Sequence, residues 1–148
     1  MDIKNFSQST PNLACCGQPS HDSFKAIREA GFMVVINLGI NNTVYSLNNE
    51  RELVTSFGLS YHTIPVEFDK PLLTDLIQFF NVMDCNFHKT LVHCASNYRA
   101  SAFVGLWMYH TKKITLDGLN AYSCQFWQPN EIWLSFIKES TEYIDKIL

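Results

Sequence analysis

A cysteine and an arginine lie five positions apart in a segment that combines a predicted strand, a tight loop and a predicted helix. Cys94 follows the apolar and β-branched residues 90–92, and Arg99 directly precedes an apolar helical stretch over residues 100–109. The free backbone amides and the positive dipole end of a helix N-terminus favour an anion. The same position lowers the pKa of a cysteine thiol and makes it a nucleophile. The segment therefore predicts an anion-binding loop that also holds a thiolate and a cation.

The neighbours of Cys94 extend this chemistry. The guanidinium of Arg99 offers a planar pair of donors that matches two oxygens of a phosphate, which a lysine does not copy. His93 is expected to fix the loop, and Ser96 or Ser101 is expected to donate a hydrogen bond that stabilises the thiolate as a leaving group. The predicted contacts to the anion come from Ala95, Ser96, Asn97, Tyr98 and Arg99.

Strand-like and helix-like segments alternate along the whole chain and must position this loop. The predicted strands are residues 13–17, 32–38, 59–66 and 90–93, and the predicted helices are residues 20–30, 43–57, 72–87, 100–112, 115–127 and 131–147. Because such alternation needs right-handed crossovers, we predict an α/β fold with a central, mainly parallel sheet of four to five strands and helices on both faces. Ligands in these folds bind beyond the carboxyl ends of the strands, where Cys94 is expected to lie.

Helix ends and apolar faces give more local expectations. Ser20 and Asn130 are the predicted N-caps of the first and last helices. The apolar face of the last helix is expected to run to Leu148. Cys15 and Cys16 are predicted to be two packed thiols, since a disulfide between adjacent cysteines is strained.

The loop resembles the His-Cys-x5-Arg-Ser/Thr signature of the cysteine-dependent protein tyrosine and dual-specificity phosphatases. The wider sequence is similar to a bacterial branch, the β-lactamase-hydrolase-like phosphatases, in Gly17-Gln18-Pro19-Ser20 and Val35-Ile36-Asn37-Leu38. The resemblance covers roughly residues 13–110. It implies a protein tyrosine phosphatase-like fold and the hydrolysis of phosphate monoesters, including phosphotyrosine, through a phosphocysteine. No metal or other cofactor is implied.

The loop departs from the phosphatase signature at three positions. Only four residues separate Cys94 from Arg99, which is one fewer than in the signature. Asn97 replaces the usual glycine, and Ala100 replaces the usual hydroxyl residue, although Ser101 follows it. Because asparagine adopts a positive φ more readily than other non-glycine residues, the loop is still expected to close.

The resemblance also implies a general acid, an Asp on a loop some tens of residues before the cysteine, which would protonate the leaving oxygen. Asp69 lies 25 positions before Cys94, just after the third predicted strand, and is the predicted acid. Glu67 is the second candidate. The alternative for Asp69 is a solvent-exposed loop position or a cap for the helix that begins near Leu72.

Two other functions stay open on the sequence alone. The four-residue spacing also resembles the active loop of rhodanese-type sulfurtransferases, which would carry a persulfide on Cys94. His93 directly before Cys94 and the two helical segments after the loop helix favour the phosphatase. A non-catalytic module that binds phosphate in the same loop is the third hypothesis.

The bulk properties exclude several classes of protein. With a net charge of −3, the chain lacks the basic clusters that nucleic-acid binding needs, and no apolar run is long enough to span a membrane. The N-terminus has no hydrophobic signal segment, and the five cysteines show no disulfide framework, so a reduced cytoplasmic protein is predicted. The histidines show no metal-ligand spacing. We expect one domain over residues 1–148, whose partner is a phosphorylated protein or a small phosphate ester.

Overall fold

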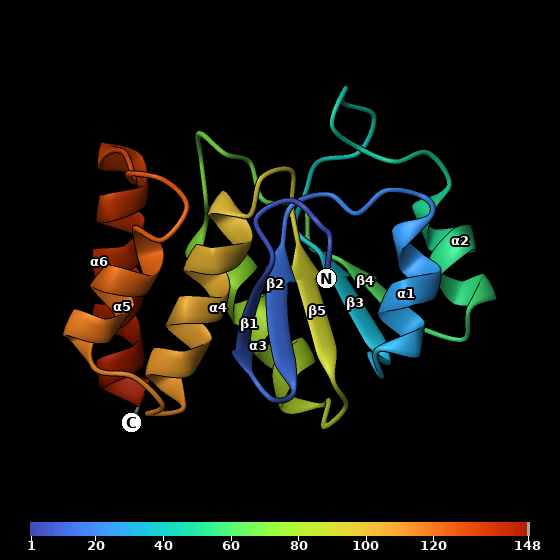
Figure 1. The fold of residues 1–148 in the computed structure, drawn as a ribbon. Coiled ribbons are helices and arrows are strands. Elements are labelled where there is room, and N and C mark those ends of the chain that lie inside the picture. Colours follow the sequence, from blue (N-terminus) through green and yellow to red (C-terminus); the bar gives the residue numbers. More distant parts are fainter. Residues whose placement is uncertain (148) are drawn as a thin grey trace.

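A five-stranded sheet forms the centre of the protein in the computed structural model, which describes residues 1–147 (Figure 1). The strand order is β1-β2-β5-β3-β4, and β1 alone runs antiparallel to its neighbour. The strands are β1 (Ser7–Thr10), β2 (Leu13–Cys16), β3 (Val34–Asn37), β4 (Ser60–Thr63) and β5 (Thr90–His93). The prediction of a mainly parallel sheet of four to five strands is therefore confirmed, and the strand that leads to Cys94 lies at its centre.

Six helices cover both faces of this sheet. The helices are α1 (Ser23–Glu29), α2 (Glu50–Ser56), α3 (Leu73–Asp84), α4 (Tyr98–His110), α5 (Leu116–Ser123) and α6 (Glu131–Ile147). Figure 1 shows α1 and α2 on one side of the sheet and α3 to α6 on the other. The prediction of helices on both faces is confirmed.

Two hydrophobic cores hold the helices to the sheet because successive residues of a strand point to opposite faces. In β2, Cys15 belongs to the core under α3 to α6, whereas Ala14 and Cys16 belong to the core under α1 and α2. In β5, Val92 belongs to the core under α3 to α6, and Leu91 belongs to the core under α1 and α2. All four residues of β5 are buried, so the strand that leads to Cys94 is fixed from both sides.

One predicted helix was wrong in extent, and one observed strand was not predicted. The helix predicted over residues 43–57 forms only at Glu50–Ser56, because Asn42 and Asn49 adopt left-handed backbone conformations with φ of 62° and 59°. Residues 39–49 are instead an irregular segment that forms part of the wall of two cavities. The strand β1 was not predicted, since its sequence Ser-Gln-Ser-Thr carries no apolar alternation.

Smaller differences concern helix ends. Helix α1 begins at Ser23 after Asp22, so Ser20 is not its N-cap, whereas Asn130 does accept a hydrogen bond from the Trp133 amide at the start of α6. Helix α4 begins at Tyr98 instead of Ala100, and α5 is shorter than predicted. Leu148, which was expected to extend the apolar face of α6, lies outside the described residues.

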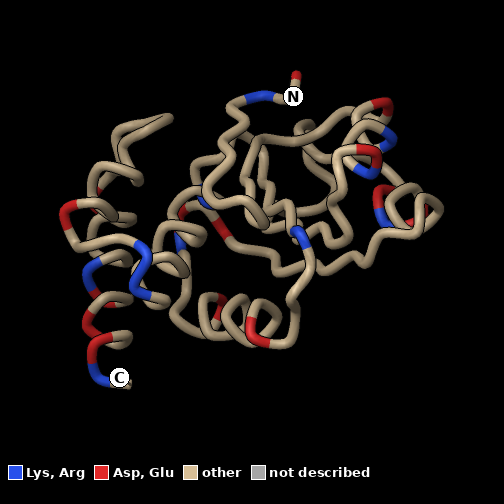
Figure 2. Tube along the Cα trace, turned by 60° about the horizontal axis from the view of Figure 1, so that its bottom comes forward, with Lys and Arg blue, Asp and Glu red and all other residues tan. Residues whose placement is uncertain are grey.

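Charged residues are distributed around the sheet and not within it. Figure 2 shows Lys, Arg, Asp and Glu mainly on helices and loops, and none of the five strands contains one. No helix within residues 1–147 has both the length and the apolar character needed to cross a membrane.

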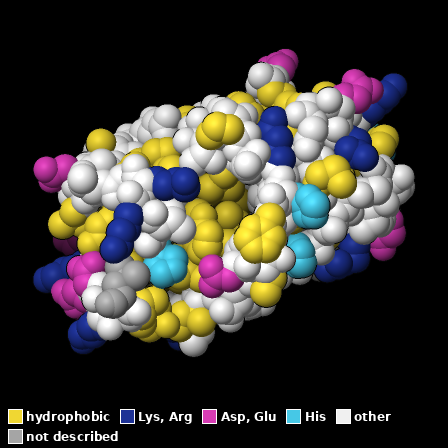
Figure 3. All heavy atoms as spheres, turned by 90° about the horizontal axis from the view of Figure 1, so that it is seen from below, with side chains coloured by type: hydrophobic (Ala, Val, Ile, Leu, Met, Phe, Trp, Pro, Cys, Tyr) yellow, Lys and Arg dark blue, Asp and Glu magenta, His cyan; other side chains and the backbone are white. Residues whose placement is uncertain are grey.

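The end of the sheet opposite Cys94 carries exposed hydrophobic side chains, visible as a yellow band in the view from below (Figure 3). A shallow cleft of about 310 Å³ at this end is lined in part by Leu13, Met83, Phe87 and Trp107. Phe87 is 92% exposed there. This surface is formed by the loops that enter the strands, so it lies away from the predicted site.

Candidate active site

Cys94 is the first residue after β5, at the carboxyl end of the central strand. Its side chain is 1% exposed, and its amide donates a hydrogen bond to the Cys16 carbonyl at 3.4 Å. The Ala100 amide, in the first turn of α4, lies 3.4 Å from the Cys94 sulfur and donates to it. A thiolate at this position would therefore be stabilised by a helix amide and by the positive end of the helix dipole.

Asn97 closes the short loop between Cys94 and α4. Its φ of 69° is the left-handed conformation that the sequence analysis predicted for this position. Its side-chain amide donates to the Asn5 carbonyl at 2.8 Å, which holds the bend. Helix α4 then begins at Tyr98, and the amides of Tyr98 and Arg99 have no partner within the helix because they belong to its first turn. These amides are available to an anion.

Arg99 lies in the first turn of α4 and is 9% exposed. One terminal nitrogen donates to the Val66 carbonyl at 2.8 Å, which ties the guanidinium to the segment that follows β4. Four of its five N–H groups remain for a ligand. The side chain is therefore pre-positioned instead of being free to sample many rotamers.

A cavity of about 490 Å³ opens above Cys94. Of the residues predicted to bind the anion, Ala95, Ser96, Tyr98 and Arg99 line it together with Cys94, whereas Asn97 is buried and does not. The other lining residues are Lys4, Gln18, Asn37, Gly39, Ile40, Thr43, Tyr45, Ser46 and Phe68. Among all the lining residues, only Lys4 and Arg99 carry a charged side chain, so the lining within the described residues is positive and contains no carboxylate.

Aromatic side chains form one wall of the cavity and accommodate the bulk of Tyr98. The Tyr98 ring stacks on Trp127 with ring centres 4.7 Å apart, and Trp127 packs against Phe68 with ring centres 5.4 Å apart. The indole nitrogen of Trp133 donates to the Phe68 carbonyl at 2.8 Å and fixes the segment that carries Phe68. This wall favours a flat apolar group next to the Cys94 loop.

The predicted acids do not line the cavity in this conformation. Residues 67–70 form a tight turn in which the Lys70 amide donates to the Glu67 carbonyl at 3.1 Å. Phe68 of this turn lines the cavity, whereas Glu67 and Asp69 are exposed. Because neighbouring side chains of a tight turn point in different directions, Asp69 reaches the cavity only if the turn moves.

The two serines do not contact the sulfur as expected. The Ser101 hydroxyl donates to the Tyr98 carbonyl at 3.2 Å within the first turn of α4. The Ser96 hydroxyl accepts a hydrogen bond from the Lys4 ammonium at 3.0 Å. The hydrogen bond from the Ala100 amide takes the place predicted for a serine hydroxyl.

Glu50, which the sequence analysis did not single out, lies directly behind the loop. Its carboxylate is 2.8 Å from Nε2 of His93, and both side chains are almost completely buried. Nδ1 of His93 lies 3.4 Å from the Cys94 carbonyl oxygen, so the histidine links the buried carboxylate to the backbone of Cys94. Glu50 lies one helical turn before the buried Val54, and this spacing was the available signal that Glu50 faces inward.

Gln18, Asn37 and Tyr61 donate three further hydrogen bonds to the Glu50 carboxylate. Burial alone would raise the pKa of Glu50, but the hydrogen bond and charge of His93, with the bonds from Tyr61 and Gln18, outweigh burial and lower this pKa. Burial and the neighbouring carboxylate raise the pKa of Tyr61. Glu50 is therefore an ionised acceptor for four donors. Its carboxylate holds the side chains of Gln18 and Asn37, which belong to the two segments that resemble the bacterial phosphatases.

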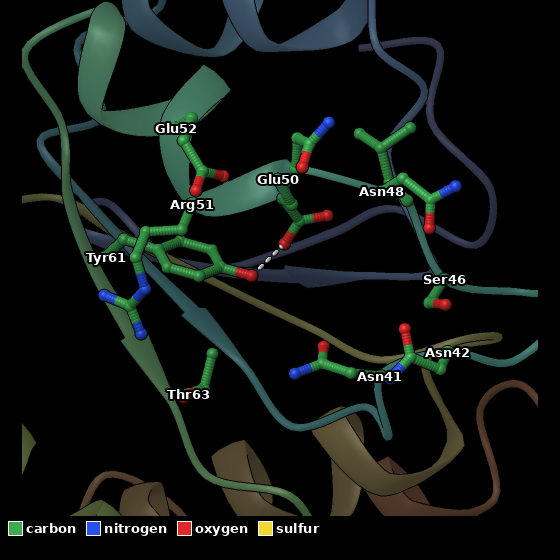
Figure 4. Close-up of a pocket in the computed structure, with 11 residues that line it drawn as sticks. Asn41, Asn42, Ser46, Asn48, Glu50, Arg51, Glu52, Tyr61 and Thr63 are labelled. Carbon is green, nitrogen blue, oxygen red and sulfur yellow. Dashed lines mark hydrogen bonds between the residues drawn. The ribbon is translucent and has the colours of Figure 1, made fainter.

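A second, more polar cleft of about 550 Å³ lies on the other side of Glu50. Figure 4 shows Glu50 and Tyr61 joined by a hydrogen bond at this cleft, with Asn41 and Asn42 across from them. Gln18 and Asn37 line the first cavity and bond to Glu50, so one layer of side chains separates the two spaces.

Two further thiols, Cys15 and Cys16, are adjacent at the end of β2. Cys15 and Cys16 are free and buried, which confirms the prediction of two packed thiols. Burial raises the pKa of both, so these thiols stay protonated near neutral pH.

Residues 1–147 contain no group of three or more His, Cys, Asp or Glu side chains that could hold a metal ion.

Comparison with solved structures identifies phosphatases as similar proteins. A Shewanella putrefaciens CN-32 protein, described as "Putative phosphatase (DUF442)", is 30% identical, with a TM-score of 0.89 over 97% of this chain and 95% of that one. Tk-PTP is 16% identical, with a TM-score of 0.79 over 95% of this chain and 96% of that one.

The core catalytic domain of the PP-IP phosphatase SIW14 from S. cerevisiae is 13% identical, with a TM-score of 0.75 over 99% of this chain and 92% of that one. At such low identities, Tk-PTP and SIW14 show the shared fold. No family model and no curated protein matches the sequence.

Proposed function

The chain belongs to the DUF442 family and is a phosphatase of the cysteine-dependent protein tyrosine and dual-specificity phosphatase-like superfamily, and from this premise we propose that it hydrolyses phosphate monoesters through a phosphocysteine on Cys94. One observation carries the proposal. Cys94, the start of α4 and Arg99 all line the same positively charged cavity, and a helix amide donates to the Cys94 sulfur. This arrangement suits an anion that is attacked by the thiolate.

The reaction follows from this geometry in two steps. The Cys94 thiolate attacks phosphorus, the bond to the ester oxygen breaks, and the leaving oxygen takes a proton from an acid or from water. Water then attacks the phosphocysteine, which releases inorganic phosphate and restores the thiolate. Arg99 and the loop amides hold the three phosphoryl oxygens and stabilise their charge in both transition states.

The aromatic wall supports an aryl phosphate such as phosphotyrosine as the substrate class. Phe68 and Tyr98 lie on one side of the cavity, and Tyr45, which is 65% exposed, lies at its opening. An aryl leaving group can pack on these rings while its phosphate occupies the loop. The substrate is a phosphorylated protein or a small aryl phosphate.

Hydrolysis of para-nitrophenyl phosphate without added metal tests the proposal. We expect turnover in the presence of a chelator, and we expect a rapidly quenched reaction to contain protein whose mass has increased by one phosphoryl group on the Cys94 peptide. Thiocyanate formation from thiosulfate and cyanide is the matched assay for sulfur transfer. Thiocyanate without phosphate release would favour the persulfide enzyme, and phosphate binding without either product would favour a binding module.

We propose Asp69 as the general acid, which requires the 67–70 turn to move toward the loop. A poor leaving group needs the proton more than a good one does. We therefore expect Asp69→Asn to lower kcat about 100-fold or more for phenyl phosphate, and by a smaller factor for para-nitrophenyl phosphate. Glu67→Gln is the control and should leave both rates within about twofold. Equal rates for wild type and Asp69→Asn on phenyl phosphate would remove Asp69 from the mechanism.

A further inference from the structure

The segment before β1 lies across the carboxyl ends of β2 and β5 and contacts the Cys94 loop (Figure 1). The Lys4 carbonyl accepts a hydrogen bond from the Gly17 amide at 2.7 Å. The Asn5 side chain donates to the Ser96 carbonyl at 2.9 Å, and Asn97 donates back to the Asn5 carbonyl at 2.8 Å. Residues 4 and 5 are thus attached to the loop through both backbone and side chains.

Gly17 permits this close approach. A Cβ atom at this position would lie 2.8 Å from the Ala95 carbonyl oxygen and 3.2 Å from the Lys4 carbonyl oxygen. Both atoms are backbone, so neither moves without moving the loop or the segment. The contact between the N-terminal segment and the loop is therefore an ordered part of the site and requires glycine at position 17.

Lys4 brings a positive charge to the cavity from this segment. Its ammonium lies 3.0 Å from the Ser96 hydroxyl of the loop, and the residue lines the cavity above Cys94. Arg99 enters the same cavity from α4. The two cations are held by elements 95 positions apart in the sequence, and both are anchored by a hydrogen bond to the protein.

The negative charge of a bound phosphate monoester exceeds the positive charge that the Cys94 loop and Arg99 supply. A phosphate monoester carries close to two negative charges near neutral pH, and a thiolate below it adds a third. Arg99 supplies one positive charge, and the helix N-terminus supplies about half of another. We propose that Lys4 is a second cation for the bound phosphoryl group, so that the N-terminal segment completes the substrate site. The inference rests on the proposed function, in which the loop binds phosphate.

Binding of inorganic phosphate, measured by calorimetry at low ionic strength, tests this role without any turnover. We expect Lys4→Met to bind phosphate about tenfold more weakly than wild type, and Lys4→Arg to restore most of the affinity. Lys25→Met removes an equal charge from an exposed position on α1 and should bind like wild type. The difference between wild type and Lys4→Met should narrow in high salt, because Lys4 is exposed.

The kinetic form of the same test separates substrate binding from a purely structural role. In Lys4→Met, KM for para-nitrophenyl phosphate should rise more than kcat falls, and the melting temperature should stay within a few degrees of wild type. Unchanged phosphate affinity in Lys4→Met, or equal loss in Lys4→Arg, would overturn the inference, as would a wild type that binds no phosphate. A wild type that binds phosphate through Lys4 but hydrolyses no ester would overturn the proposed function and leave this inference standing.

Discussion

Replacing Cys94 with serine is expected to reduce the turnover of para-nitrophenyl phosphate by about 10⁴-fold or more. The serine hydroxyl stays protonated near neutral pH, and no His, Asp or Glu lines the cavity within the described residues to remove its proton. The helix amide that now contacts the sulfur would contact a neutral oxygen. The loop itself is unchanged, so Cys94→Ser should still bind inorganic phosphate in a calorimetric titration.

Cys85→Ser is the matched control for this substitution. Cys85 is a free, exposed thiol just after α3, away from the lining of the cavity. The kcat/KM of the Cys85→Ser variant should remain within about twofold of the wild-type value, as is usual for surface substitutions. Turnover by Cys94→Ser above about one per cent of wild type would contradict the phosphocysteine mechanism.

Replacing Glu50 with glutamine is expected to lower the free energy of unfolding by about 3 kcal/mol at pH 7. The carboxylate is 5% exposed and accepts hydrogen bonds from His93, Gln18, Asn37 and Tyr61. A glutamine presents its amide NH₂ to at least one of these donors and leaves the His93 ring without a charged partner. Urea unfolding of wild type and Glu50→Gln at pH 7 measures the difference.

The pH dependence of this difference identifies its cause. Burial opposes ionisation of Glu50, but the bonds and charge of His93 and the bonds from Tyr61 and Gln18 lower its pKa below 4.5 in the folded protein. Because the folded pKa is below the unfolded one, Glu50 contributes stability that is fully present above about pH 4.5 and is lost as the pH falls through the folded value. The difference in the free energy of unfolding between wild type and Glu50→Gln should therefore narrow as the pH falls from 4.5 through the lowered pKa of Glu50.

Glu52→Gln provides the control on the same helix. Glu52 is exposed, so its substitution should change the free energy of unfolding by no more than about 0.5 kcal/mol, both at pH 7 and at acid pH. If Glu50→Gln fails to fold, Tyr61→Phe removes one donor and should cost about 1 kcal/mol. A Glu50→Gln protein as stable as wild type at pH 7 would show that the buried carboxylate does not support the loop.

Neighbouring residues were enough to predict the order of strand, loop and helix around Cys94 and the type of most elements. Strand, cysteine, turn, arginine and helix are contiguous from residue 90 to residue 110, so local propensities decide their arrangement, and Asn97 takes the positive φ that its residue type permits. The buried strand β5 could also be predicted, because a short apolar run between turns is typical of a buried strand. The Asn-rich segment before Glu50 was misread as helix, because its turn-forming residues outweigh its weak apolar spacing.

The side chains that reach this loop from distant parts of the sequence could not be predicted without the fold. Glu50 lies 43 positions before His93, and Lys4 lies 92 positions before Ser96, yet each forms a hydrogen bond with its partner. No local pattern encodes such pairs, because they arise from strand order and from the path of the N-terminal segment. The turn at residues 67–70 was equally unpredictable. Phe68 lines the cavity and its neighbour Asp69 does not, because the conformation of the turn sets the direction of each side chain.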